Sequence, residues 1–515
     1  MSAWIEGAVG RLYGSVAAAR AAGRVGVAAV RDSRISDSRR LLAAPATPAF
    51  DVRRAAGLVV LVAATALLTL SAFAAIPAAS AQDSDIRENR TRQPGTYMGV
   101  ASCAGSTCHG RAEGNGEVVR QDEIATWQEP SSSTGAHSRA YAVLAGQRGR
   151  QIAASLGIGA ATSAPQCLGC HATYVPGANK GSRFLLEDGV GCESCHGPSG
   201  GWLASHYAKP ATHAANVRNG LIPLDLPQAR AQNCLDCHYG AAGSNQFVTH
   251  EMMAAGHPRV AFELDLFSAL SQHWDVDADY VARKGRPDSV RMWAVGQAEA
   301  VKRQTSLFTK PEYAQQGMFP EFYFYDCHSC HRTITDGPRR KLTFETNSGR
   351  PIPFGNPPFN DENIIMLNAV AKALAPGQAA AFEKASRDFH RAMGTGRSAA
   401  AKAAGTLSSR AGALSSALAG RSYNGNAAFQ VIAAIADRQT RARLTDYTGA
   451  AQSVMAVDTL LNALVREGRI TQGAAAGIRA DINRAYAAVR NPNDFRPTQF
   501  RTALGQATSA IGTLR

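Results

Sequence analysis

The chain has 515 residues and a formal net charge of +14, a length that allows about three domains of ~150 residues each. Residues 1–81 hold nine Arg and Lys against four Asp and Glu, which leaves +9 for the remainder, so the basic character alone does not indicate nucleic-acid binding. The sequence contains no Ser/His/Asp arrangement, glycine-rich phosphate loop or paired-carboxylate motif, which excludes the reaction classes that depend on them.

The first 81 residues are predicted to form a leader, with a signal peptide over residues 52–81. Arg53 and Arg54 precede an apolar run, and the small residues of a signal-peptidase site follow at 79–81. The strongly apolar part, Leu58 to Leu70, is shorter than the ~20 residues of a membrane span. We therefore expect cleavage near Ala81 and a periplasmic protein, with an uncleaved membrane anchor as the alternative. Residues 1–52 indicate a start codon assigned too early.

After a polar linker at 82–100, the chain contains ten cysteines, and every one belongs to a short pair followed at once by histidine. The five runs are Cys103–Cys108 with His109, Cys167–Cys170 with His171, Cys192–Cys195 with His196, Cys234–Cys237 with His238, and Cys327–Cys330 with His331.

This pattern is the attachment signal of haem c. Two thiols add to the two vinyl groups of the haem, and the adjacent histidine becomes the proximal ligand of the iron. Zinc sites are the main alternative, but five pairs are an odd number for four-ligand sites. Disulfides or redox dithiols would leave the histidine after every pair unexplained. The sequence therefore predicts five covalent haems c, held by the ten cysteines and the five adjacent histidines.

The first run departs from the others, because four residues rather than two separate Cys103 from Cys108. Gly105 and Ser106 make a local bulge feasible, since glycine tolerates unusual backbone conformations. We expect full attachment here, with a single thioether or an absent haem as alternatives.

The haem segment is predicted to cover residues 101–335. From Cys103 to His331 it spans 229 residues, or about 46 per haem, too few for an ordinary core, so the haems themselves should form the core. Their ten propionates would nearly cancel the surplus positive charge, which removes the case for a nucleic-acid partner. A Pro- and Gly-rich linker at 336–360 then leads to a helical domain at 361–515, where Val454, Val457, Leu460, Leu461, Leu464 and Val465 mark one apolar face. Little strand is expected, so the fold class is mainly α.

Eight histidines remain for five distal positions, enough for every iron to be bis-histidine. His250 and His257 lie seven residues apart, a spacing that can serve two adjacent haems. His328 is a weaker candidate, and His273 and His390 are expected to be ordinary. The distal candidates are His137, His206, His213, His250 and His257.

Three stretches resemble the cytochrome c-554 family of multihaem relays related to hydroxylamine oxidoreductase. They are the residues around Cys103 from Gly99, the stretch from Trp127 through His137 to Tyr141, and Gly189 to Pro198, and the likeness covers about residues 98–240. The resemblance implies a mostly helical fold, haems stacked in pairs, and distal roles for His137 and His206. The family's type member has four haems, one of them with an open sixth position, whereas this chain has five haem runs.

These observations predict an exported electron carrier that works between an electron donor and an acceptor protein. One alternative is an enzyme in which one open-site haem acts on a small nitrogen or sulfur compound. Another is a structural conductor of stacked copies. The C-terminal helices are expected to dock a partner or to form a homo-oligomer.

Overall fold

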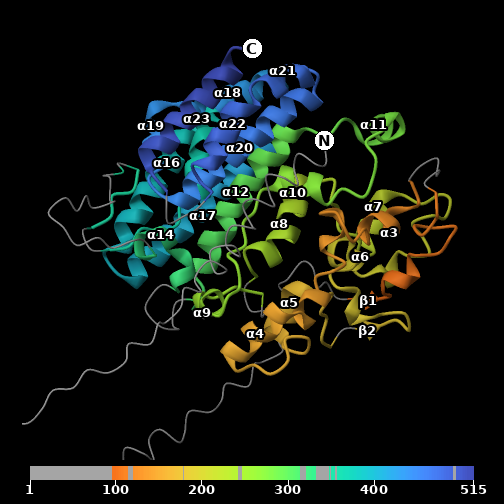
Figure 1. Ribbon diagram of the computed structural model, residues 1–515. Coiled ribbons are helices and arrows are strands. Elements are labelled where there is room, and N and C mark those ends of the chain that lie inside the picture. Colours follow the sequence, from red (N-terminus) through yellow and green to blue (C-terminus); the bar gives the residue numbers. More distant parts are fainter. Residues whose placement is uncertain are drawn as a thin grey trace, which may run out of the picture. The chain divides into compact units, whose positions relative to one another are not determined.

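The fold is mainly helical, as the sequence predicts (Figure 1). This computed structural model describes residues 95–113, 120–177, 179–241, 246–311, 313, 321–331, 347, 349–353, 356–490 and 495–515. The predicted leader and most of the linker at 82–100 lie outside the described residues. Among the helices that are described, none combines the length and the hydropathy needed to cross a bilayer.

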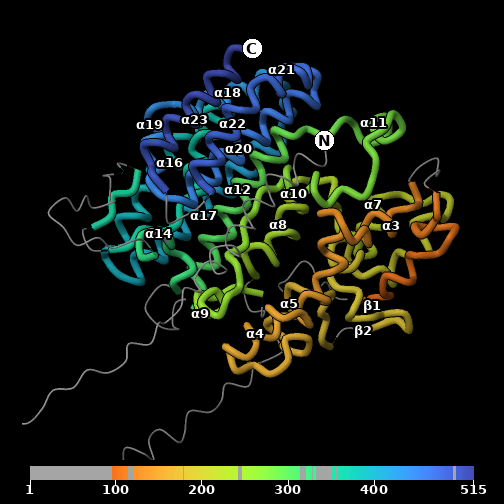
Figure 2. The backbone as a smooth tube through the Cα atoms, viewed as in Figure 1, coloured from red at the N-terminus to blue at the C-terminus, as the bar shows by residue number. Residues whose placement is uncertain are grey.

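The haem-bearing part consists of short helices joined by long irregular stretches, which the orange to yellow part of the tube shows in Figure 2. Within the described residues, the sheet consists of two parallel strands of two residues each, β1 (Thr96–Tyr97) and β2 (Asn179–Lys180). This confirms the expectation that the fold contains little strand. The described α-helices of this part that precede residue 289 are α3 (Glu123–Trp127), α4 (Gln147–Leu156), α5 (Pro165–His171), α6 (Cys192–His196), α7 (His213–Arg218), α8 (Pro227–His238), α9 (His250–Ala254), α10 (Leu264–Leu270) and α11 (Ala278–Lys284). Single 3-10 turns are η3 (Val100–Ser102), η4 (Thr134–Ala136), η5 (Ala142–Ala145), η6 (Leu186–Asp188), η7 (Ser199–Gly201) and η8 (Phe322–Phe324).

Helix α12 (Ser289–Phe308) is the long exception in this part of the chain. It begins where the Asp288 carboxylate accepts a hydrogen bond from the Arg291 amide (2.9 Å), an N-cap that satisfies an otherwise unpaired donor. Most of its residues are buried, and Trp293 is completely so. A helix that is buried on most of its sides must be surrounded by other elements. Accordingly, α12 packs against α8 and α10 before it in the chain and against helices of the C-terminal segment after it.

The short α14 (Cys327–Cys330) carries the fifth cysteine pair, and the C-terminal helices follow it. Val454, Val457, Leu460, Leu461 and Leu464 are buried on one face of α20, as predicted, and Val465 is partly buried. Burying each such side chain stabilises the fold by about 1.5–3 kcal/mol. The helices are α15 (Glu362–Leu374), α16 (Pro376–Met393), α17 (Arg397–Ala419), α18 (Gly425–Ala436), α19 (Arg438–Arg441), α20 (Tyr447–Arg466), α21 (Gln472–Gly477), α22 (Arg479–Ala487) and α23 (Pro497–Gly512).

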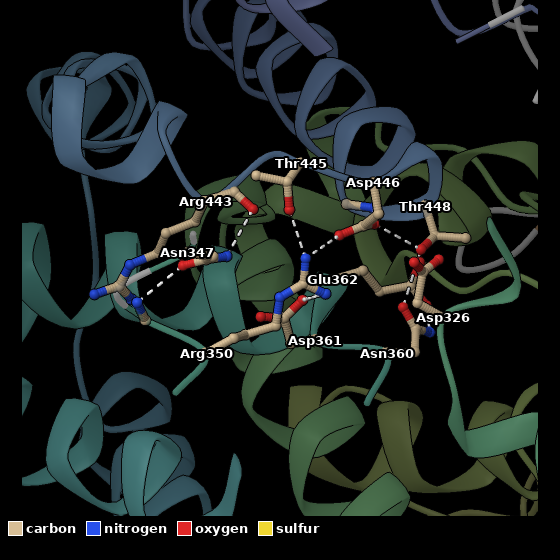
Figure 3. A network of polar contacts seen from close by, with 12 residues as sticks. Asp326, Asn347, Arg350, Asn360, Asp361, Glu362, Arg443, Thr445, Asp446 and Thr448 are labelled. Carbon is tan, nitrogen blue, oxygen red and sulfur yellow. Dashed lines mark hydrogen bonds and ion pairs between the residues drawn. The ribbon is translucent and has the colours of Figure 1, made fainter. Parts of the chain in front are cut away.

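A buried polar network joins the start of α15 to the start of α20 (Figure 3). The Arg350 guanidinium lies 3.4 Å from the Asp361 carboxylate and 3.1 Å from the Asp446 carboxylate, and all three side chains are almost fully buried. Asp446 also caps α20, because it accepts a hydrogen bond from the Gly449 amide (2.7 Å). The network therefore fixes Arg350 against the N-termini of two helices.

Burial raises the pKa of Asp361 to about 7, and the neighbouring Asp446 adds to the effect. An unfolded aspartate has a pKa of about 3.9, so between these values the folded protein binds a proton that the unfolded chain releases. That contribution to stability is complete below about pH 4 and is lost as the pH rises through about 7. Asp361→Asn is expected to remove up to about 1.4 kcal/mol per pH unit of this slope. Unfolding midpoints of both proteins between pH 4 and 8 check it. Asp388→Asn on the surface of α16 is the control and should leave the slope unchanged.

Candidate haem sites

Each cysteine pair after the first lies on a short helix, with its histidine on the same helix or directly after it. Spacings of three and four residues bring the two sulfurs and the imidazole to one helix face. Pro165 and Pro227 open α5 and α8, where a proline loses no hydrogen bond. All ten cysteines are described, and no disulfide links them. Four of the five runs therefore present two thiols and an imidazole together, as haem attachment requires.

In the first run, the four intervening residues fold into a compact turn. The His109 amide donates to the Cys103 carbonyl (3.1 Å), and the Cys108 amide donates to the Gly105 carbonyl (2.8 Å). A side-chain carbon added to Gly105 would lie 3.4 Å from the Cys108 sulfur, so glycine leaves that sulfur free of a close neighbour. The two extra residues of this run are thus accommodated within the turn, and a backbone hydrogen bond connects Cys103 to His109.

Four proximal histidines each face a second histidine from a distant part of the sequence. An iron between two imidazole nitrogens at about 2 Å each separates the ring centroids by roughly 6 Å. The observed centroid separations are 6.2 Å for His109 with His206, 6.2 Å for His171 with His257, 6.3 Å for His196 with His273, and 6.0 Å for His331 with His250. Each of these sites therefore has the spacing that one bis-histidine iron needs.

Nδ1 is hydrogen-bonded in several of the proximal and distal candidate rings. Where Nδ1 lies against a backbone carbonyl oxygen, Nδ1 must carry the proton and donate it. The lone pair then lies on Nε2 and can bind iron. His109 instead directs Nδ1 to the Glu123 carboxylate (2.9 Å), and this bond raises the pKa of His109. The carbonyl contacts join His171 to Ala140 (2.8 Å), His206 to Leu203 (2.6 Å), His257 to Pro258 (2.7 Å), His273 to Ser271 (3.0 Å) and His238 to Ala261 (3.3 Å).

The fourth proximal histidine, His238, has aromatic neighbours, with the Phe267 ring centroid 5.2 Å from its own. His137 lies at the C-terminal end of η4. Burial lowers the pKa of His137 to about 4, and the charges of His238 and His273 act in the same direction, so both lie near it. The pKa of His196 is lowered to about 3, again mainly by burial. These rings stay neutral at physiological pH, which is the form that binds iron.

The remaining histidines differ from the expectations drawn from the sequence. His213 opens α7, its side chain is 58% exposed, and its Nε2 lies 3.3 Å from the Asp225 carboxylate, so no proximal histidine faces it. His273, expected to be ordinary, faces His196 instead. His390 is buried in α16 beside Asp361, away from the cysteine pairs. The side chain of His328 lies outside the described part of the structure.

The cysteine runs also contact one another. The Cys103 and Cys192 thiols lie close enough to shift each other's pKa, lowering that of Cys103 and raising that of Cys192, which places the first run beside the third. The Cys170 sulfur lies 3.9 Å from the Cys237 carbonyl oxygen, which joins the second run to the fourth. The family resemblance implies haems in pairs, and these two contacts bring the runs together in pairs.

A buried carboxylate supports the first of these pairs. Glu193 accepts hydrogen bonds from the amides of Met98 (2.9 Å), Gly99 (2.8 Å) and Ser199 (2.7 Å) and from the Ser199 hydroxyl (2.6 Å). Glu193→Gln is expected to lower the stability of the holoprotein by about 1–3 kcal/mol, because the amide nitrogen cannot accept a hydrogen bond. Unfolding midpoints check this, with exposed Glu187→Gln as the control. Equal stabilities for the two variants would contradict the assigned role of Glu193.

Comparisons with known proteins agree with this geometry over part of the chain. The sequence model of the family described as "Cytochrome c554 and c-prime" matches residues 102–197, which include the first three cysteine runs. No curated protein and no solved structure matches the chain. Residues 102–197 are therefore a domain of the cytochrome c554 and c-prime family, a family of multihaem c-type cytochromes.

Proposed function

We propose that this chain is an exported pentahaem cytochrome c that passes electrons between a donor and an acceptor protein. The observation that carries the proposal is the set of four histidine pairs with centroids 6.0–6.3 Å apart, one at each of four cysteine runs. The family match, whose members are mostly electron carriers, supports the same class.

Five sites would each take one haem c, which supplies reversible one-electron oxidation and reduction at its iron. Two thiols of each run hold the haem, and the histidine beside them serves as proximal ligand. The proposed proximal and distal pairs are His109 with His206, His171 with His257, His196 with His273, His238 with His137, and His331 with His250.

The chain's own residues keep both axial positions filled. Carbonyl groups hold Nδ1 of five of these histidines, so those five rings are fixed in orientation and their Nε2 atoms stay available. A filled sixth position leaves no place for a small substrate on the iron. This favours electron transfer over the alternative, an enzyme with one open-site haem.

Two of the sites reach the surface, as contact with partner proteins requires. Cys108 in the first run and Cys330 in the fifth are exposed, and so is His331. Electron transfer needs close approach of partners to a haem rather than a substrate pocket. We therefore propose the first and fifth sites as the regions where the redox partners bind.

The test is a reductive titration of the exported, purified protein combined with its intact mass. The expected mass is that of the processed chain plus five haems, and the protein should take up five electrons. Nitrite, hydroxylamine and sulfite should not be turned over by the reduced protein. A mass with fewer haems, or steady turnover of one of these compounds, would contradict the proposal.

A further inference from the structure

The segment from His250 to Arg259 lies between two proposed haem sites. His250 faces His331 of the fifth run, and His257 faces His171 of the second. Helix α9 separates the two histidines, and its end is closed by a hydrogen bond from the His257 amide to the Met252 carbonyl (2.9 Å). Arg259 follows two residues after His257, so its position is fixed by the same short segment.

Arg259 extends from this segment to the fifth cysteine run. Its guanidinium donates to the Tyr323 carbonyl (3.2 Å) and to the Cys327 sulfur (3.4 Å), and it lies over the Tyr323 ring, 4.7 Å from the centroid. The side chain is half-buried. Cys327 is one of the two sulfurs that would bind the fifth haem, so the positive charge lies at the attachment point itself.

No carboxylate among the described residues forms an ion pair with Arg259. The nearest acidic influence is Glu362 at the start of α15, which acts through space and is itself hydrogen-bonded to the Asn360 amide (3.0 Å). A half-buried cation without a carboxylate partner is costly. A carboxylate in direct contact would cancel most of the positive charge at the site, whereas Glu362 acts on Arg259 without forming an ion pair with it.

We propose, on the basis of the pentahaem function above, that Arg259 raises the reduction potential of the haem bound to Cys327 and Cys330. Reduction adds one negative charge to a haem site, and a nearby fixed cation stabilises that reduced form more than the oxidised one. The interaction is strong because water is largely excluded between the guanidinium and the sulfur. Arg259 thus makes the fifth site a better electron acceptor than it would be without this charge.

The experiment is a spectroelectrochemical titration of the holoprotein and three variants. Arg259→Gln removes the charge but keeps a donor for the Tyr323 carbonyl, and Arg259→Lys keeps the charge. Arg391→Gln is the control, because it removes the same charge away from Cys327, where the Arg391 guanidinium forms an exposed ion pair with Asp388 (2.9 Å) on the surface of α16. The expected result is that one haem in five shifts to a more negative potential in Arg259→Gln alone.

Other results of the titration would contradict the role of Arg259. An unchanged titration curve in Arg259→Gln, an equal shift of all five haems, or a variant with only four haems would overturn the role of Arg259. If Arg259→Gln does not yield holoprotein, the Arg259→Lys variant is decisive. A more negative potential of one haem in Arg259→Lys, which keeps the positive charge, would contradict the proposal. Failure of the proposed pentahaem function can be distinguished from failure of the role of Arg259, because in that case the wild-type protein itself would carry fewer than five haems.

Discussion

His273→Ala is expected to convert one of five ferric haems to the high-spin state, whereas His213→Ala is expected to leave all five low-spin. His273 faces His196 at 6.3 Å between ring centroids, and its Nδ1 is held by the Ser271 carbonyl. Removing it leaves the iron of the haem attached to Cys192 and Cys195 without a sixth protein ligand. His213, by contrast, is exposed and contacts Asp225.

The measurement is ferric EPR of both variants, normalised to haem content. The wild-type protein sets the reference, and imidazole added to His273→Ala should return the open haem to low spin. If His213→Ala produces the high-spin haem and His273→Ala does not, the proposed pairing of the third site is wrong.

Arg350→Met is expected to destabilise the protein by about 3–5 kcal/mol, the largest stability loss that we predict. The substitution keeps the apolar volume but leaves the buried carboxylates of Asp361 and Asp446 without their shared cation. Uncompensated charge in a low dielectric costs far more than the loss of one hydrogen bond. The thermal unfolding midpoint of the holoprotein, followed by far-UV circular dichroism, measures the effect.

Arg391→Met is the matched control, because Arg391 forms an exposed ion pair with Asp388 (2.9 Å) on the surface of α16. Such pairs contribute at most about 1 kcal/mol, so its midpoint should stay close to that of the wild type. Adding Asp361→Asn and Asp446→Asn to Arg350→Met should recover part of the stability, since no buried charge is then left unpaired. A midpoint for Arg350→Met equal to that of the control would contradict the account of the network.

The mainly helical fold and the apolar face of α20, both predicted from local spacing in the sequence, are confirmed. The haem attachment residues also rest on local spacing and stay a prediction. The distal histidines depend on long-range packing, and there the prediction was partial. His206, His250 and His257 face proximal histidines, as the sequence suggested. His213, expected to face a proximal histidine, is exposed, whereas His273, expected to be ordinary, faces His196. Nothing in the sequence within a few residues of His273 reveals that it packs against the third run.

Helix α12 is a second example of what local patterns do not reveal. It lies between the fourth and fifth cysteine runs, within the predicted haem segment, yet its apolar residues share one core with α15, α17 and α20. The Pro- and Gly-rich linker indicates where helices stop along the chain. It carries no information about which helices pack together across it.

If every haem is held between two histidines, the ferric EPR spectrum of the wild-type holoprotein, quantified against its haem content, will show it most directly. Low-spin signals are expected for all five haems. Perpendicular imidazole planes favour signals with a large maximum g value, and the ring planes are 88° apart for His171 with His257 and 86° apart for His196 with His273. His109 and His206, at 15°, should give an ordinary rhombic signal. A high-spin signal from about one haem in five would contradict the account and would make the enzyme with an open-site haem the better description.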